Sequence, residues 1–520
     1  MRRSRRGRRS RRGLWLALGA VVAAAAGLAA AVYLLSGARL AADPVALAHV
    51  ELQPFAGSVA GVRASAAGAP VPVEVRNGRL TPRTRLRPGE TVAVDVVVRR
   101  PGWSSWALGA ERQEHLSVTA PTAHVAQRWL IVAPGRAPKV QFDMRVSRVV
   151  LGGRDRTVDA AATTLPTRAP AGTVEVAAAA RPWEVPGAPV RVTWFPQSDR
   201  PVALAAPAPG TSIAPLTPIR LTFSRPVSAT LGDARPALSP PLPGTWAQTD
   251  SHTLVFHPAG FGAPFASDET VRFATPVRVL RGTSWHVAPA SFLRLQQLLA
   301  AEGYLPLTWS PTGSDVARGR RAELSAAVSP PAGRFHWRYA NTPPELQSLW
   351  RTGQPNEIVR GAVMMFEHDH GLAVDGIAGP RVWRAAISDA VAGKRRDAGY
   401  SYVYVHRNVP QRLTLWHNGS VVLTSPGNTG VPAAPTQLGT WPVFEHIPVG
   451  RMSGTNPDGS HYDDPGIRWI SYFHGGEALH AFNRASFGTP QSLGCVELPL
   501  AEAARVWPYT PIGTLVTIEN

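Results

Sequence analysis

The sequence predicts a multidomain, mainly β protein with a membrane-spanning helix at its N-terminus, a small helical domain in its second half and a mostly β domain at its C-terminus. The chain has 520 residues, and at roughly 150 residues per domain this length suggests several domains. Short runs of β-branched and aromatic residues, separated by Gly and Pro, recur along the chain. Hydrophobic residues make up 44% of it, enough for packed cores, so wholesale disorder is not expected.

The N-terminus combines a basic tail with an apolar segment. Residues 1–12, MRRSRRGRRSRR, are rich in Arg and contain no acidic residue, and they supply much of the net charge of +19. Residues 14–35 are uncharged, and about 20 apolar residues cross a bilayer as a helix. We therefore expect a cytoplasmic tail at 1–12, an uncleaved signal anchor at 13–36 and a single-pass protein of the cell membrane with an extracytoplasmic remainder. A cleaved signal peptide or a buried helix is the alternative.

The basic composition does not indicate a nucleic-acid partner. Nearly all of the cations are Arg, with Lys at Lys139 and Lys394, a bias typical of GC-rich genomes such as those of actinobacteria. No segment after the tail combines a basic run with interleaved aromatic residues, so nucleic-acid binding is not expected. The remaining positive charge would suit an anionic cell wall.

Residues 44–284 are expected to be all β. The run VPVEVRNGRL alternates and then turns at Asn77-Gly78, a hairpin signal. Further on, TPIRLTFSRPV places alternate apolar residues on one strand face. We divide this part into a β-sandwich at 44–120, a second β-sandwich at 121–206 and an Ig-like domain at 207–284. No catalytic chemistry stands out here, so we expect a spacer that lifts a distal domain off the membrane, with a binding role as the alternative.

Residues 285–393 are expected to form a small domain of three helices. Phe292 and Leu295 begin an apolar stripe of helical spacing, and Ser291 is suited to cap that helix. A second stripe ends at Phe366, and Pro380 begins the third helix. The segments LQQLLAAEGYLP and AVMMFEHDHGLAVDGIAGPRVW resemble the three-helix peptidoglycan-binding domain of many cell-wall enzymes. The resemblance implies binding to the glycan.

Two stretches could be mistaken for metal sites. In EHDH, His368 and His370 lie two residues apart and so point to different helix faces, whereas a zinc pair on a helix needs a spacing of four. Residues 453–466, SGTNPDGSHYDDPG, lack the spaced acids and the terminal Glu of a calcium loop. We expect no metal or other cofactor, and we interpret 453–466 as a loop that covers a substrate.

Residues 400–520 are expected to form a mostly β domain that contains the single cysteine, Cys495. One cysteine excludes an internal disulfide. Cys495 lies 25 residues from the C-terminus, so it is not a lipid-attachment site behind an export signal. A buried core thiol is the ordinary alternative to a nucleophile.

A nucleophilic thiol needs a partner that takes its proton, usually His. His480 lies in an apolar, strand-like run after a Gly-Gly turn and fifteen residues before Cys495, which favours it as the base, with His474 as the second choice. Gly494 and the predicted helix PLAEAARVW after Cys495 suggest backbone N–H groups for an oxyanion. The six histidines considered are His406, His417, His446, His461, His474 and His480.

The C-terminal residues resemble the catalytic domain of L,D-transpeptidases (the YkuD type) as found in actinobacteria. The sequence LHAFNRASFGTPQSLGCVEL matches the family's strand His, its loop of about 15 residues and its Ser-x-Gly-Cys-Val motif. PTQLGTWPV and GIRWISYFHGGEALHAF resemble the turn and the aromatic strand that precede the catalytic His in that family. Many members have His where Leu493 stands, and Arg or Asn where Glu497 stands.

The resemblance implies a role for each matching residue. Cys495 would be the nucleophile and His480 the general base and acid, oriented by the backbone at Ala481, while Ser492 and Gly494 would support the loop and the oxyanion. Tyr472 and Glu497 are candidate substrate-binding residues. The implied activity joins peptidoglycan stem peptides by 3→3 links through a Cys acyl-enzyme, and carbapenem β-lactams would be inhibitors. A hydrolase with the same Cys–His dyad and a non-catalytic wall-binding scaffold are the alternatives.

Overall fold

The computed structural model describes residues 9–275 and 277–520, and the chain divides into two compact units. The first unit comprises residues 1–204 and 222–225, and the second comprises 205–221 and 226–520. Among the described residues, the helix α1 (Arg9–Leu35) is long and apolar enough over Leu14–Leu35 to cross a membrane, and a signal sequence would share this property. The predicted cytoplasmic tail lies mostly outside the described residues.

The first β domain of unit 1 consists of two four-stranded sheets around one core. One sheet has the order β1 (Ala38–Ala42), β2 (Ala48–Leu52), β6 (Arg79–Pro82), β5 (Val73–Arg76). The other has the order β4 (Ala69–Pro70), β3 (Ser58–Ala66), β7 (Thr91–Arg99), β8 (Glu111–Thr119). Alternate valines of β7 enter the core, as a half-buried strand requires. A short helix, α2 (Gly102–Leu108), connects β7 to β8.

The rest of unit 1 is a single five-stranded sheet, whereas a β-sandwich at 121–206 was expected from the sequence. Its order is β11 (Arg154–Thr164), β10 (Lys139–Leu151), β12 (Gly172–Ala179), β13 (Val190–Pro196), β9 (Trp129–Val132). Two register shifts interrupt the pairing of β10 with β11, and such irregularities bend a strand. Buried residues of β9, β10, β12 and β13 contribute to one core.

Two further four-stranded sheets lie between residues 203 and 287, and the division between the units runs through this region. Buried side chains of β16 (Ile219–Phe223) supply part of the core, as the alternation of its sequence predicted. The other strands are β14 (Ala203–Ala206), β15 (Ser212–Ile213), β17 (Leu238–Ser239), β18 (Gly244–Asp250), β19 (Thr253–Pro258), β20 (Glu269–Phe273) and β21 (Ser284–Val287), with the short helices α3 (Val227–Leu231) and η1 (Arg278–Leu280).

Residues 285–393, all of them described, contain more elements than the three helices expected. The predicted helices correspond to α4 (Phe292–Ala301), α7 (Glu357–Asp369) and α8 (Pro380–Ala392). The added elements are α5 (Arg320–Val328), α6 (Pro344–Ser348) and a hairpin of β22 (Leu307–Pro311) with β23 (Gly333–Trp337). Ser291 precedes α4 but makes no capping hydrogen bond. Glu367, at the end of α7, is buried and accepts the backbone N–H groups of Asp375 and Gly376.

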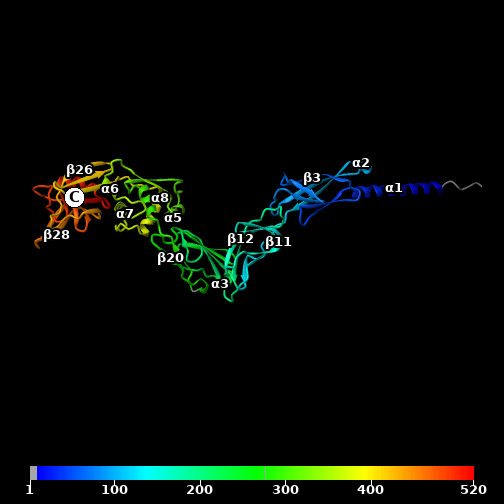
Figure 1. Cartoon of the computed structure of the whole chain (residues 1–520), viewed down its shortest axis with the longest axis horizontal. Helices are drawn as coiled ribbons and strands as arrows, with labels where there is room; N and C mark the ends of the chain where they lie inside the picture. The colour runs from blue at the N-terminus through cyan, green and yellow to red at the C-terminus, as the bar shows by residue number, and fades with distance from the viewer. Residues whose placement is uncertain (1–8, 276) are drawn as a thin grey trace, which may run out of the picture. The chain divides into compact units, whose positions relative to one another are not determined.

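The C-terminal domain has two sheets that pack around one core and are labelled at β26 and β28 in Figure 1. The first is β26 (Ser420–Pro426), β25 (Arg412–His417), β24 (Ser401–His406), β32 (Leu515–Glu519), β27 (Gly439–Pro442). The second is β28 (Glu445–Thr455), β29 (His461–His474), β30 (Glu477–Ala481), β31 (Val496–Leu498). The short helices α9 (Leu500–Val506) and η2 (Trp507–Tyr509) lie between β31 and β32 in the chain.

The helical segment packs directly on the C-terminal domain. Gly361 of α7 lies so close to the loop before β32 that a Cβ atom there would be 2.4 Å from the carbonyl oxygen of Gly513. On another part of the contact, the indole N–H of Trp416 donates to the carbonyl of Asn341 over 2.9 Å, and Tyr339 donates to Asn418 over 2.7 Å. Backbone contact on one side and directional hydrogen bonds on the other hold the two parts in one orientation.

The Gly361→Ala substitution is expected to destabilise unit 2 by about 1–3 kcal/mol, because the added methyl group must push two backbones apart. A loss of stability would be diagnostic of the close packing, because Gly→Ala within a helix otherwise raises the free energy of unfolding by up to about 1 kcal/mol. Thermal unfolding of the purified protein measures the change. Gly313→Ala is the matched control, because a Cβ at that position meets no atom within 4 Å. Equal melting temperatures for both variants would contradict the close packing.

Candidate active site

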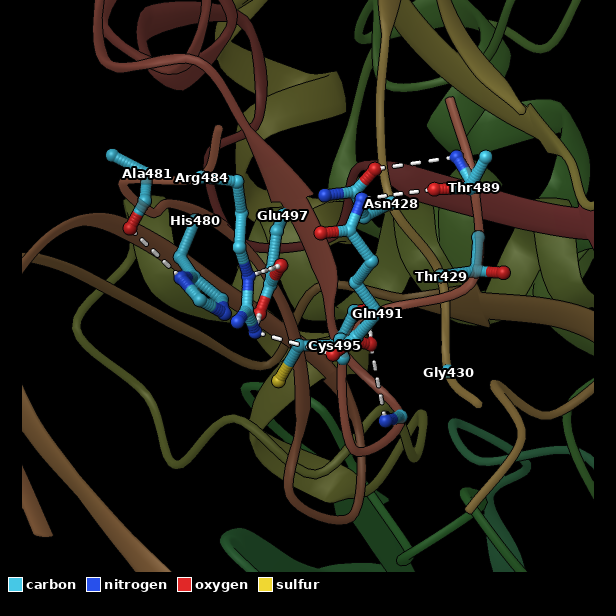
Figure 2. Close-up of polar contacts among 12 residues, drawn as sticks. Asn428, Thr429, Gly430, His480, Ala481, Arg484, Thr489, Gln491, Cys495 and Glu497 are labelled. Atoms are coloured by element: carbon cyan, nitrogen blue, oxygen red, sulfur yellow. Dashed lines mark hydrogen bonds and ion pairs between the residues drawn. The ribbon is translucent and has the colours of Figure 1, made fainter. Parts of the chain in front are cut away.

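His480 is held in one orientation by the backbone of the next residue. It lies in β30, is 3% exposed, and its Nδ1–H donates to the carbonyl oxygen of Ala481 over 2.9 Å. Since a carbonyl only accepts, Nδ1 carries the proton and Nε2 is left with a lone pair. Figure 2 shows the other edge of the ring turned toward the side on which Cys495 lies. Burial lowers the pKa of His480, so the ring is a neutral base at pH 7.

Cys495 is a protonated thiol in this environment. It directly precedes β31, is half-buried, and its Sγ lies 3.7 Å from the carbonyl oxygen of Gly476. Burial raises the pKa of Cys495 to about 12, helped by the negative charges of Glu497 and Glu477 and opposed by a backbone hydrogen bond from Ala478. A thiol of this kind becomes a nucleophile only when a neighbouring base removes its proton.

His480 and Cys495 line the same cavity, which has a volume of about 300 Å³. One wall comes from the hairpin of β28 and β29, and the other from the chain between β30 and β31. Residues 453–466, expected as an irregular loop, are the paired outer part of that hairpin, with Thr455 opposite His461. The lining residues are Met452, Asn456, Tyr462, Asp464, Ile467, Gly476, His480, Phe482, Arg484, Gln491, Ser492, Leu493, Cys495 and Glu497.

Ser492 fixes the loop that carries Cys495. Its hydroxyl donates to the carbonyl oxygen of Cys495 over 2.5 Å and accepts from the N–H of Gly494 over 3.2 Å. Gly494 has a φ of +116°, a conformation that favours glycine. Because the N–H of Gly494 is engaged by Ser492, the oxyanion role suggested for Gly494 does not fit this geometry, whereas loop support does.

The Ser492→Ala substitution is expected to cost about 1–3 kcal/mol of stability, because it leaves a buried N–H and a carbonyl without their shared partner. Since the loop also positions the thiol, we expect acylation of Cys495 to slow by roughly tenfold. Denaturant unfolding and the rate of thiol acylation measure the two effects. Ser486→Ala, an exposed serine in the same inter-strand segment, should change neither.

Glu497 is paired with Arg484, a residue that no sequence motif indicated. Glu497 is 4% exposed and lies opposite His480 in the parallel pairing of β30 with β31. Its two oxygens accept from Nε of Arg484 over 2.8 Å and from Nη2 over 2.6 Å (Figure 2). Nη2 also donates to the carbonyl of Gln491 over 3.2 Å. Glu497 is therefore a buried member of an ion pair.

The structure places Tyr472 beside the cavity but not on its wall. The ring belongs to the apolar cluster that includes Cys495, and it stacks with Phe444 at a centroid distance of 6.2 Å. Tyr462 and Asp464, two residues apart on β29, face the cavity instead. Their alternation could have indicated a strand face, but the surrounding Gly, Pro and Asp residues indicated a loop.

Among the described histidines, His480 is the one that lines this cavity. His474, the second choice for the base, stacks on Trp441 at 4.2 Å and lies 3.5 Å from a carboxylate oxygen of Glu477. The Nε2–H of His446 donates to the carbonyl oxygen of Trp507 over 3.0 Å, and the His446 ring stacks on the indole at 4.1 Å. Residues 9–275 and 277–520 contain no group of three potential metal ligands.

Comparison with known proteins identifies one family. The family model of the L,D-transpeptidase catalytic domain (YkuD) matches residues 400–518. Solved structures that resemble the chain include an L,D-transpeptidase from Mycobacterium smegmatis, at 13% identity and a TM-score of 0.22, covering 61% of this chain and 98% of the other. L,D-transpeptidase 3 from Mycobacterium tuberculosis with a faropenem-derived adduct gives the same four values. The catalytic domain of the E. faecium enzyme has 22% identity, a TM-score of 0.21 and coverages of 23% and 95%. No curated protein matched.

Proposed function

Because residues 400–518 belong to the L,D-transpeptidase catalytic domain family, we propose that this chain is a peptidoglycan acyltransferase that forms 3→3 cross-links through an acyl-enzyme on Cys495. One observation carries the proposal. The imidazole of His480, oriented by the Ala481 carbonyl, lines the same cavity as the protein's single thiol. This pairing of an oriented base with a nucleophile is the arrangement that acyl transfer requires.

The reaction proceeds in two balanced halves. Nε2 of His480 takes the proton of the Cys495 thiol as Sγ attacks the carbonyl carbon of the third stem residue, a diamino acid. The imidazolium then protonates the leaving amine of D-Ala, the C–N bond breaks, and a thioester forms. In the second half, the side-chain amine of another stem attacks the thioester, His480 takes its proton, and the thiol is regenerated with that proton.

Both His480 and Cys495 are uncharged before substrate binds. The raised pKa of Cys495 and the lowered pKa of His480 oppose a standing thiolate–imidazolium pair. The proton therefore moves during the attack, as in general-base catalysis. Water in the cavity would convert transfer into hydrolysis, so the hydrolase is the nearest alternative function.

We expect the rate of Cys495 acylation to be constant above neutral pH and to fall only below pH 6.5. His480 acts as a neutral base, its pKa is lowered, and protonation disables it only when the pH passes below that lowered value. At alkaline pH, ionisation of the Cys495 thiol should not change the acylation rate below about pH 10, because the pKa of this thiol is too high. Single-turnover acylation by a carbapenem, followed by intact mass, gives the profile. A rate that falls between pH 7 and pH 9 would indicate a preformed ion pair instead.

Product analysis separates transfer from its alternatives. The purified chain is incubated with tetrapeptide muropeptides, and the products are resolved by mass spectrometry. Transfer gives a cross-linked dimer with loss of D-Ala, and a hydrolase gives tripeptide alone. The non-catalytic scaffold gives neither product and no carbapenem adduct. A tripeptide as the only product under excess acceptor would disprove transpeptidation while leaving the nucleophile intact.

The remaining parts of the chain fit a wall enzyme held at the membrane. We propose that α1 is an uncleaved anchor and that the described remainder lies on the cell-wall side. The β domains between 44 and 284 would then act as a spacer. The segment 285–393, through its resemblance to peptidoglycan-binding domains, would hold glycan near the cavity, since it packs on the C-terminal domain at Gly361 and Trp416.

A further inference from the structure

The first β domain binds the end of the apolar helix α1 through its backbone carbonyls. The N–H of Phe55 donates to the carbonyl of Leu35 over 3.0 Å, and the guanidinium of Arg112 donates to the carbonyls of Tyr33 and Leu34. The last carbonyls of a helix lack partners within it. The domain supplies those partners, so the helix end and the domain form one structural element.

Two arginine side chains reinforce this junction around Tyr33. The guanidinium groups of Arg100 and Arg112 lie 5.4 and 5.1 Å from the centre of the Tyr33 ring. Arg100 is 6% exposed, and its Nε donates to the hydroxyl of Ser36 over 2.9 Å. Its Nη1 donates to the carbonyls of Leu108 and Gly109, at the end of α2. One buried side chain therefore ties α2 to the first residue after α1.

The outward face of α2 is apolar and largely exposed in the described part of the chain. Trp103 and Trp106 are 58% and 84% exposed, and their spacing of three places them on one helix face. The opposite face is packed, since Ser104 is buried. The Trp106 indole N–H donates to the carbonyl of Trp103 over 2.9 Å, so its polar group is satisfied while the ring is presented outward. Such exposed tryptophans are a costly feature for a water-facing surface.

The position of α2 places this face next to the end of the apolar span. Trp103 contacts Phe55 edge-on at 6.0 Å, and the N–H of Phe55 is bonded to the carbonyl of Leu35, the last residue of the apolar span. In Figure 1, α2 lies beside the C-terminal end of α1, within the same compact unit. Leu52, 40% exposed, lies opposite Ala38, three residues after the end of α1, and adds exposed apolar surface near that end. Tryptophan is the residue that membrane–water interfaces enrich.

We propose that the face of α2 formed by Trp103 and Trp106 docks onto the lipid bilayer that α1 spans, so that the first β domain rests on the membrane surface. The proposal depends on α1 being retained as the anchor, and it does not depend on the chemistry at Cys495. A bilayer would bury both indole rings of this face. Its surface would also lie at the level where α1 ends, which is where the face is found. The membrane attachment then has two points, a spanning helix and an interfacial one.

The test measures the depth of single labelled positions in the full chain. Cys495→Ala removes the native thiol, and an environment-sensitive fluorophore is attached at Trp106→Cys, at Ala25→Cys within α1, or at Thr119→Cys. Thr119 is the matched control because it lies at the far end of β8, seven residues from Arg112, or about 23 Å at strand spacing. The protein is reconstituted in nanodiscs of phosphatidylethanolamine and phosphatidylglycerol that contain nitroxide-labelled lipid.

Docking predicts quenching at position 106 by a nitroxide placed near the head groups, several-fold stronger than at position 119. Trp103→Cys, on the same face, should behave like Trp106→Cys. Equal, weak quenching at 106 and 119 overturns the proposal. Strong shielding at 106 in native membranes but not in lipid nanodiscs also overturns it, because a protein would then be the occupant. An unquenched label at Ala25 with acyl-chain nitroxide overturns the anchor and this docking together, while leaving the acyl-transfer proposal untouched.

Discussion

Cys495→Ala is expected to abolish acyl transfer, with a loss of about 10³-fold or more, and to remove the carbapenem adduct entirely. The side chain supplies the only thiol in the chain, and no other group lining the cavity is a comparable nucleophile at neutral pH. Turnover of tetrapeptide muropeptides and intact mass after carbapenem treatment measure the two effects. An adduct that forms equally on the variant would place the nucleophile elsewhere and end the proposal.

The controls for this prediction come from the histidines. His480→Ala should lose activity nearly as completely as Cys495→Ala, because the thiol has a pKa of about 12 and needs a base. His474→Ala, which removes a histidine outside the cavity, should retain most of the activity. Combining Cys495→Ala with His480→Ala should add little to either loss, since residues that act as a unit are not additive.

Arg484→Met is expected to destabilise the C-terminal domain by about 3 kcal/mol, because it leaves the buried carboxylate of Glu497 without its partner. Glu497→Gln should cost less, because the arginine side chain is 30% exposed and reaches water. The double variant Arg484→Met, Glu497→Met should recover much of the loss, since apolar residues of similar volume often replace a buried ion pair. Denaturant unfolding of all three variants measures these differences.

The acylation rate falls at low pH, and this fall is the acid limb of its pH profile. Arg484→Met and Glu497→Gln should shift the acid limb in opposite directions. The charge of Glu497 raises the pKa of His480, and the charge of Arg484 lowers it. Arg484→Met therefore moves the limb to higher pH, and Glu497→Gln moves it to lower pH. A purely structural ion pair would change stability but leave the position of the limb unchanged, so identical limbs in the two variants would show that the pair does not tune the base.

Local patterns were sufficient to predict the hairpin at Asn77-Gly78 and to place His480 in a strand-like run. Asn77-Gly78 and Asn418-Gly419 turn β5 into β6 and β25 into β26, because both positions adopt positive φ values that these residues tolerate. His480 falls on a buried strand because its neighbours are apolar. The helix predicted after Cys495 is present as α9. The short strand β31, in which Val496 pairs with Leu479 of β30, lies between Cys495 and that helix and was not predicted.

The features missed by sequence depend on contacts between distant segments. Arg484 pairs with Glu497 because the parallel pairing of β30 with β31 brings together the two ends of the chain segment between these strands. No rule of sequence spacing predicts that contact. The outer part of β29 lies within 453–466, which was interpreted as a loop, and it contains Pro465. The strand tolerates this residue because β30 pairs with β29 only from Ser471 onward, so Pro465 lies at an open edge.

The hydrogen bond between His480 and the carbonyl of Ala481 has a consequence for how this site can change over time. Its acceptor is a main-chain atom, so mutation at position 481 replaces the side chain but leaves the oxygen in place. A main-chain carbonyl also does not titrate, so acidification cannot release the ring as it would release one held by a carboxylate. The orientation of the His480 ring therefore depends on the backbone of β30 and not on any neighbouring side chain. Substitutions around His480 that preserve this strand leave the orientation unchanged.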